Sequence, residues 1–302
     1  MSDALDYLHA TLQSLHDNGT KLKAPRSVLE RLAHSKAPAA KRLAVETPAA
    51  PLSTSSPIVA ETPARRPFSI PSPAPAPAIA PVETGPMTHL APASGSKAER
   101  LAAMRPTVLS CQKCPNLVAR RTQVVFGVGN PEAELMFVGE APGEDEDKQG
   151  EPFVGRAGEL LTKIIVAMGL TREKVYIGNV LKCRPDMPPG VSGNRKPRPD
   201  EMQTCLPYLR EQIEIIQPKA LVALGATALE GLTGENIPVG RARGRWMQFH
   251  GIPLMVTYHP AYLLRNQAIS EKRKVWEDML LVLEKLEHPI SEKQRGYFLA
   301  KG

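Results

Sequence analysis

The sequence predicts an α/β fold, namely a three-layer α/β/α sandwich with a central, mainly parallel four-stranded sheet and a disordered N-terminal extension. Two observations predict it. Between residues 135 and 257, short apolar runs alternate with stretches of helical pattern, which is typical of a parallel sheet with helices on both faces. Residues 35–95 consist largely of Pro, Ala and Ser, and such a composition does not form a packed core.

The expected elements follow one another in a regular order. The predicted strands are Leu135–Val138, Val175–Ile177, Ala220–Leu224 and Leu254–Thr257. The predicted helices among and after them are Glu159–Met168, Pro199–Ile216, Thr227–Leu232 and Glu271–Leu286. Ahead of the first strand, Ser96 is placed to cap a helix that runs to about Ala103.

Composition divides the 302 residues into four parts. Residues 1–34 contain an apolar stripe at helical spacing, which predicts a short amphipathic segment. That segment is either a marginal helix or a docking helix for a protein partner. Residues 35–95 form the expected disordered linker, residues 96–288 the globular domain and residues 289–302 a tail.

The net charge of +7 and the isoelectric point near 9.2 favour an acidic partner such as nucleic acid. Basic tails alone produce the same total, so the charge is a weak indication. No apolar run approaches the roughly 20 residues that span a membrane, and the N-terminus lacks the features of a signal peptide. We therefore expect no membrane partner and a cytoplasmic location, where thiols stay reduced.

The stretch from residue 134 to 158 is the most informative. Its apolar run ends at Gly139, and Glu140 follows directly. Ligands of open α/β sheets bind beyond the carboxyl ends of the strands, which is where Glu140 lies. Residues 144–147 are all acidic, are expected in the following loop, and are succeeded by Phe153. The alternative is a capped turn with solvated acids.

Two more polar residues follow predicted strands. Asn179 has an amide that can donate one hydrogen bond and accept another, and His259 begins the run HPAYLLRN. Each could be an ordinary turn or structural residue. Their coincidence with Glu140 at three strand ends predicts one shared site.

Basic loops lie near the expected mouth of this site. One follows Cys183 and another contains three arginines in GRARGRW. Both suit contacts with phosphate, and an apolar residue beside a basic one can wedge into a duplex. The alternative is a solvated basic surface. The candidates for DNA contact are Arg184, Arg243, Leu264 and Arg265.

The chain has 4 cysteines, all in the expected globular domain. Cys111 and Cys114 form a CxxC pair, whereas Cys183 and Cys205 stand far apart. Four thiolates hold either zinc or an iron–sulfur cluster, and this spacing leans toward a cluster. Such a group would be structural, because it would pin the N-terminal segment of the domain to the sheet. Buried free thiols are the alternative.

Together these residues resemble family 4 of the uracil-DNA glycosylase superfamily, whose members carry a [4Fe–4S] cluster. The matching motifs are GEAPGEDED with PFVGRAG, NVLKCRP and HPAYLLRN, with the cysteines in the same order. The resemblance covers about residues 100–286. It implies an enzyme that flips uracil out of single- or double-stranded DNA and hydrolyses the N-glycosidic bond, leaving an abasic site. It also implies a structural [4Fe–4S] cluster on Cys111, Cys114, Cys183 and Cys205.

The resemblance also implies roles in the site. Glu140 and Ala141 would line the uracil pocket, Phe153 would stack on the ring, and Asn179 would read its pairing edge. His259 would donate a hydrogen bond to uracil O2 and stabilise the negative charge of the leaving base. Ala141 has no polar group where some relatives carry one. Glu140 is therefore the first candidate for positioning water, and Glu146 is the second.

The same residues argue against several other interpretations of the chain. A non-catalytic DNA- or partner-binding module on the same fold is disfavoured by the intact Glu140, Asn179 and His259. Family 5 typically lacks an acid at the position of Glu140. A covalent uracil-binding subgroup uses a histidine before the fourth cysteine, and residues 186–204 contain none. A zinc-binding fold remains the alternative for the cysteines.

Overall fold

The computed structural model of the protein describes residues 90–188, 191 and 193–299. The amphipathic segment predicted within residues 1–34 and nearly all of the predicted linker lie outside the described residues. In the described parts of the chain, no helix is both long enough and apolar enough to cross a membrane. The domain boundaries proposed from composition stay predictions.

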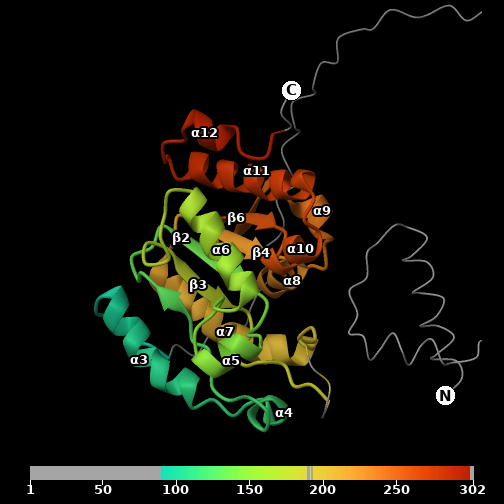
Figure 1. Ribbon diagram of the computed structural model, residues 1–302. Helices are drawn as coiled ribbons and strands as arrows, with labels where there is room; N and C mark the ends of the chain where they lie inside the picture. Colours follow the sequence, from blue (N-terminus) through green and yellow to red (C-terminus); the bar gives the residue numbers. More distant parts are fainter. Residues whose placement is uncertain (1–89, 189–190, 192, 300–302) are drawn as a thin grey trace, which may run out of the picture. The chain divides into compact units, whose positions relative to one another are not determined.

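The sheet is mixed, with antiparallel edges and a parallel centre, whose strands are labelled in Figure 1. Its strands are β1 (Val128–Gly129), β2 (Leu135–Gly139), β3 (Tyr176–Asn179), β4 (Ala220–Leu224), β5 (Trp246–Phe249) and β6 (Ile252–Thr257). They lie in the order β1-β3-β2-β4-β6-β5. The inner four are parallel, whereas β1 pairs antiparallel with β3, and β5 with β6.

The α/β prediction is confirmed, but the predicted number of strands was wrong, because the described sheet has 6 strands rather than four. The two missed strands are the edges. β1 has 2 residues, one of them glycine, and β5 alternates buried with more exposed positions. Neither edge strand therefore contains the continuous apolar run that marks a strand buried on both faces.

The helices bracket these strands in the expected alternation. The described helices are α3 (Lys97–Leu109), α4 (Pro115–Val118), α5 (Glu144–Gln149), α6 (Arg156–Ala167), α7 (Pro199–Ile216), α8 (Ala226–Thr233), α9 (Val239–Ala242), α10 (Pro260–Arg265), α11 (Ile269–Lys285) and α12 (Glu292–Arg295). Ser96 caps α3 as predicted: its Oγ accepts from the Glu99 N–H, and its own N–H donates to the Glu99 carboxylate. The helix continues past Ala103 because Met104 and Val108 are buried against the domain.

The acidic run was expected in a loop, and that prediction was wrong. Residues 144–147 form the first turn of α5. Carboxylates are favourable there because the free N–H groups of a helix start carry partial positive charge. The acidic run therefore stabilises the start of α5, whether or not a ligand is bound.

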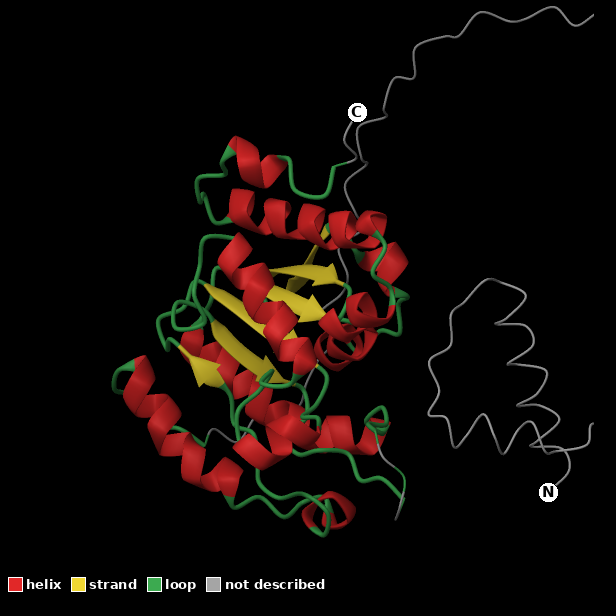
Figure 2. Ribbon diagram, viewed as in Figure 1, coloured by secondary structure: helices red, strands yellow, loops and turns green. Residues whose placement is uncertain are grey.

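Helices cover both faces of the sheet, as Figure 2 shows. On β2, Met136 and Val138 pack into one core with residues of α3, α7 and α8. Leu135 and Phe137 point to the opposite face and pack with residues of α6 and α11. Because successive side chains of a strand alternate between faces, one short apolar run contributes to both cores. The parallel strands thus lie rigidly between two helical layers, and their carboxyl ends share one edge.

Candidate active site

Three of the predicted residues meet at the carboxyl ends of β2, β3 and β6. Gly139 pairs in register with Asn179. A Cβ atom on Gly139 would lie 2.3 Å from Asn179 Oδ1 and 2.6 Å from Cε2 of Phe153. The rings of Phe153 and His259 have centroids 5.5 Å apart and are tilted by 31°. The amide and the phenyl ring therefore pack directly against Gly139, where only a glycine fits, and the imidazole lies beside the ring.

Asn179 carries an unsatisfied acceptor. The residue is 2% exposed, and its Oδ1 atom has no hydrogen-bond partner within the described part of the chain. A buried polar atom without a partner costs about 1–3 kcal/mol, so such atoms are uncommon unless a ligand completes them. A ligand N–H group entering beside Gly139 would satisfy this oxygen.

His259 is held in one tautomer. It caps the N-terminus of α10, and its Nδ1 atom accepts a hydrogen bond of 3.1 Å from the Ala261 N–H. The proton of the neutral imidazole is therefore on Nε2, which becomes a hydrogen-bond donor. Burial, together with the charge of Arg265, lowers the pKa of His259 to about 4. The imidazole is thus neutral at physiological pH.

The two carboxylate candidates lie in different surroundings. Glu140 is half-buried directly after β2, beside Ala141, and its carboxylate makes no hydrogen bond within the described residues. Glu146 is engaged on both oxygens. Its Oε2 accepts from the Gly143 N–H at 3.0 Å, and its Oε1 accepts from the Val154 and Gly155 N–H groups, each at 3.0 Å. Glu140 is therefore available for chemistry, whereas Glu146 organises the loop on either side of α5.

Comparison with known proteins agrees with this geometry. The family model described as "Uracil DNA glycosylase superfamily" matches residues 126–280. The chain belongs to the uracil DNA glycosylase superfamily. The match includes Glu140, Phe153, Asn179 and His259, and begins after the CxxC pair.

Several members of the superfamily are similar over most of their length. The type-4 uracil-DNA glycosylase of Thermotoga maritima is 47% identical over 174 residues, which are 57% of this chain and 87% of that protein. The type-4 enzyme of Archaeoglobus fulgidus is 42% identical, with 55% and 83% covered. That of Sulfurisphaera tokodaii is 42% identical, with 67% and 91% covered. The resemblance to family 4 that the motifs predict is confirmed.

The four cysteines of this superfamily member come together. Cys111, Cys114, Cys183 and Cys205 line one small cavity, together with Leu117, Arg121, Leu181, Thr204 and Tyr208. Hydrogen-bond donors face the sulfur atoms: Arg121 Nη1 lies 2.9 Å from Cys183 Sγ, and the Lys182 N–H lies 3.2 Å from Cys205 Sγ. As far as the chain is described, no three His, Cys, Asp or Glu side chains are grouped to hold a single metal ion.

The residues predicted to contact DNA differ in their exposure and in their partners within the protein. Arg265 is exposed and Leu264 half-exposed on α10, directly after His259. The Arg184 side chain is 21% exposed, donates to the Gly193 carbonyl at 3.1 Å and lies 3.5 Å from Glu144. Leu264 and Arg265 are therefore accessible at the surface, whereas Arg184 is already engaged by Gly193 and Glu144.

Arg243 is used inside the protein instead. Its guanidinium is 16% exposed and binds both oxygens of Asp278, at 3.1 and 2.9 Å, and also the Lys274 carbonyl. Asp278 is fully buried and accepts a further bond of 2.6 Å from Thr257. The structure therefore does not place Arg243 with the other DNA-contact candidates. Arg243 joins the end of α9 to α11, and Asp278 in turn joins α11 to Thr257 at the end of β6.

Replacing Arg243 with alanine should mainly destabilise the fold. The change leaves the Asp278 carboxylate buried without its cation, which costs about 3–5 kcal/mol for a fully buried pair and roughly 2–3 here because Arg243 keeps some solvent. Denaturant unfolding would measure the loss. Arg241→Ala, an exposed neighbour, is the matched control and should change stability little. A stable Arg243→Ala protein with weakened DNA binding would contradict this assignment.

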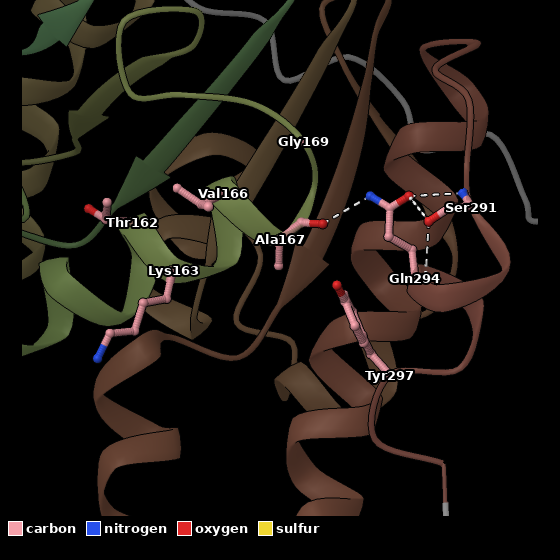
Figure 3. Close-up of a pocket in the computed structure, with 8 residues that line it drawn as sticks. All are labelled: Thr162, Lys163, Val166, Ala167, Gly169, Ser291, Gln294 and Tyr297. Carbon is pink, nitrogen blue, oxygen red and sulfur yellow. Dashed lines mark hydrogen bonds between the residues drawn. The ribbon is translucent and has the colours of Figure 1, made fainter.

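A second hollow lies away from the strand ends, between α6 and the C-terminal segment (Figure 3). Its walls include Lys163 and Val166 on one side and Gln294 and Tyr297 on the other. Gln294 Nε2 donates to the Ala167 carbonyl at 2.9 Å and so joins the two sides. None of the predicted site residues lines it.

The sequence reasoning missed Arg121 and Arg172. Arg121 follows the CxxC motif closely, and this proximity was a usable signal for a cation beside the thiols. Arg172 lies in the turn between α6 and β3, where no motif marks it, yet its guanidinium binds the carbonyls of Pro152 and Phe153 at 2.8 and 3.1 Å.

Proposed function

We propose that this protein is a uracil-DNA glycosylase of the type-4 kind, which flips uracil out of DNA and hydrolyses its N-glycosidic bond to leave an abasic site. The single observation that carries the proposal is the buried, unpartnered Oδ1 of Asn179 beneath Phe153 and His259. The names of the similar proteins support it. A cytoplasmic location and a catalytic domain over residues 96–288 are part of the proposal.

Asn179 would select the base. Its amide can accept from N3–H of uracil through Oδ1 and donate to O4 through Nδ2. Cytosine presents the reverse pattern at both atoms, and each buried mismatch costs about 1–3 kcal/mol. Phe153 would stack on the ring, and Glu140 and Ala141 would line the pocket at the end of β2. The base must first leave the stack, at a cost of a few kcal/mol.

His259 would stabilise the leaving group. As the glycosidic bond breaks, negative charge develops on the base, and a donor aimed at O2 stabilises it. The Nε2–H of the neutral imidazole is that donor, because Nδ1 is occupied by the Ala261 N–H. Glu140 would position the attacking water or stabilise the sugar cation. Glu146 would act by holding the loop, since its oxygens bind three backbone N–H groups.

DNA would be held at the same edge. Leu264 and Arg265 follow His259 on one short helix, so an apolar wedge and a phosphate contact would sit beside the flipped base. Arg184 would contact the backbone from the loop after β3. The partner is uracil-containing DNA, single- or double-stranded. The docking role predicted for residues 1–34 stays a prediction.

A [4Fe–4S] cluster fits the four thiols. A cluster takes one thiolate on each iron, and here four thiols surround one cavity. Cys111 and Cys114 lie between α3 and α4, Cys183 follows β3, and Cys205 is on α7. The cluster would therefore tie the N-terminal segment of the domain to the sheet and serve structure rather than the reaction. The charged Arg121 donor beside Cys183 suits a thiolate.

The purified protein should be brown, absorb near 400 nm and contain about four irons per chain, as thiolate-bound clusters do. Cys183→Ser should lose iron and colour, because it removes one ligand. Thr204→Ala, which changes the same cavity wall without removing a thiol, should keep both. One zinc per colourless chain would overturn the cluster and favour the zinc alternative.

The proposed activity has a direct test. The protein is incubated with single- and double-stranded oligonucleotides that carry one uracil, and abasic sites are then cleaved with alkali. Strand breakage only at uracil is the expected result. Binding without breakage would support the non-catalytic module instead. A heat-stable protein–DNA adduct would place the protein in the covalent subgroup.

A further inference from the structure

The backbone at Phe153 is strained. Its φ is +55°, in the left-handed region that bulky residues rarely adopt. The side chain is nevertheless buried, 6% exposed, with its ring against the Gly139 position and near His259. An ordinary negative φ would carry the ring away from this place. Strained residues persist only where the surroundings determine them, so other residues must hold Phe153.

The contacts that hold it come from three directions. Arg172 donates from Nη2 to the Pro152 carbonyl at 2.8 Å and from Nη1 to the Phe153 carbonyl at 3.1 Å. Glu146 fixes the next two N–H groups in the chain. Gly158 lies so close that a Cβ atom there would be 1.9 Å from the Phe153 carbonyl carbon.

Arg172 is the only one of these residues that reaches Phe153 from outside the acidic motif and the segment after it. It lies in the turn between α6 and β3 and is half-buried. Its Nη1 also donates to Thr162 Oγ1 at 3.3 Å, which orients the guanidinium from α6. The planar fork can bind two successive carbonyls at once, which the single ammonium of lysine cannot do in the same geometry.

We infer that Arg172 is a positioning residue for base recognition: by binding the carbonyls of Pro152 and Phe153, it holds the Phe153 ring over the base pocket. It touches no base itself. This inference rests on the proposed function, because it names the residue that sets the stacking surface of the same site. It predicts that the effect of Arg172 on uracil excision is transmitted entirely through the Phe153 ring.

A double-mutant cycle tests this transmission. Arg172→Met should lower kcat/KM for uracil excision about 10- to 100-fold, the scale expected when a reacting group is misplaced by about 1 Å. Phe153→Ala should cost at least as much. In the Phe153→Ala protein, adding Arg172→Met should cost less than about threefold, because the ring it positions is gone. Losses that multiply in full would overturn the inference.

Controls separate positioning from folding. Arg273 also donates to two backbone carbonyls, of Arg295 at 2.8 Å and Tyr297 at 2.9 Å, but these contacts join the second turn of α11 to the C-terminal segment. Arg273→Met should leave kcat/KM within about twofold, since it removes the same chemistry elsewhere. If Arg172→Met fails to fold, Arg172→Lys keeps the charge and should show an intermediate loss. Wild-type activity retained in full by Arg172→Lys would count against the two-carbonyl grip.

A measurement that needs no DNA distinguishes the positioning role of Arg172 from the proposed glycosylase activity. Amide exchange at Val154 and Gly155 should accelerate about 10-fold or more in Arg172→Met, because the loop opens more often, and should not change in Arg273→Met. If the wild-type protein excises no uracil, the proposed function fails, yet the exchange result still decides whether Arg172 holds this segment. Unchanged exchange in Arg172→Met would overturn the inference.

Discussion

His259→Ala should reduce the rate of uracil excision about 100- to 1,000-fold, the usual loss when one donor to a developing negative charge is removed. DNA binding should change little, because Leu264 and Arg265 remain. Single-turnover kinetics on a uracil oligonucleotide, together with a binding measurement, would separate the two effects. His288→Ala is the matched control, since that histidine faces Glu134 elsewhere on the domain and should leave both unchanged. Equal losses of binding and cleavage would contradict the leaving-group role.

His259 should also make the free energy of unfolding depend on pH. Its pKa of about 4 in the folded protein lies below the ordinary value of 6.5. Between these values the unfolded chain binds more protons, so the free energy of unfolding should fall as pH decreases from 6.5 toward 4. His259→Ala should flatten that part of the profile, because it removes the group that takes up the proton on unfolding. Parallel profiles for the wild type and His259→Ala would show that the imidazole is not held neutral.

Asn179→Asp should lower the preference for uracil over cytosine at least about 100-fold, because two buried polar contacts that distinguish the bases are altered. An ionised aspartate only accepts, and it would face uracil O4 without a donor. A protonated one can present its O–H and C=O groups in either order, so it can pair with either base. Competitive cleavage of uracil and cytosine oligonucleotides would measure the ratio.

Asn130→Asp provides the control for this change, because Asn130 lies just after β1 in a hollow at the opposite edge of the sheet. It should leave the preference unaltered. An unchanged ratio in Asn179→Asp would remove Asn179 from base reading, and the orphaned Oδ1 would then need another ligand.

Much of the fold could be predicted because the inner strands are buried on both faces. The observed boundaries of two elements equal the predicted ones, namely those of strand β4 (Ala220–Leu224) and helix α7 (Pro199–Ile216). An uninterrupted apolar run is typical of a buried strand, and a long amphipathic pattern is typical of a helix. The edge strands were missed because half-exposed strands resemble loops. Once the parallel order is expected, the placement of Asn179 and His259 at the same edge of the sheet follows, since parallel strands present their carboxyl ends at one edge.

The roles of charged residues were harder to predict. In the sequence, Arg243 and Arg265 are both arginines in basic segments, and nothing separates their roles. The structure separates them, because Arg243 forms an ion pair with the buried Asp278. Glu146 stands among other acids in the sequence, yet its oxygens alone bind both ends of the loop. Arg243 and Asp278 are 35 positions apart in the sequence, and the fold brings them together. A local sequence pattern therefore does not reveal that the two charges pair.

The short helix α10 connects His259, the proposed leaving-group donor at its cap, to Leu264 and Arg265, the proposed DNA contacts. The Nδ1 atom of His259 is fixed by the N–H of Ala261, which precedes Leu264 by three residues in the same helix. Pressure of a DNA strand on Leu264 or Arg265 would therefore be transmitted to the imidazole through a single rigid turn. Under the proposed roles, the leaving-group donor and the residues that contact DNA would move as one unit. Alignment of the chemistry thus depends on how the strand is seated, so a badly seated strand would leave the donor out of line.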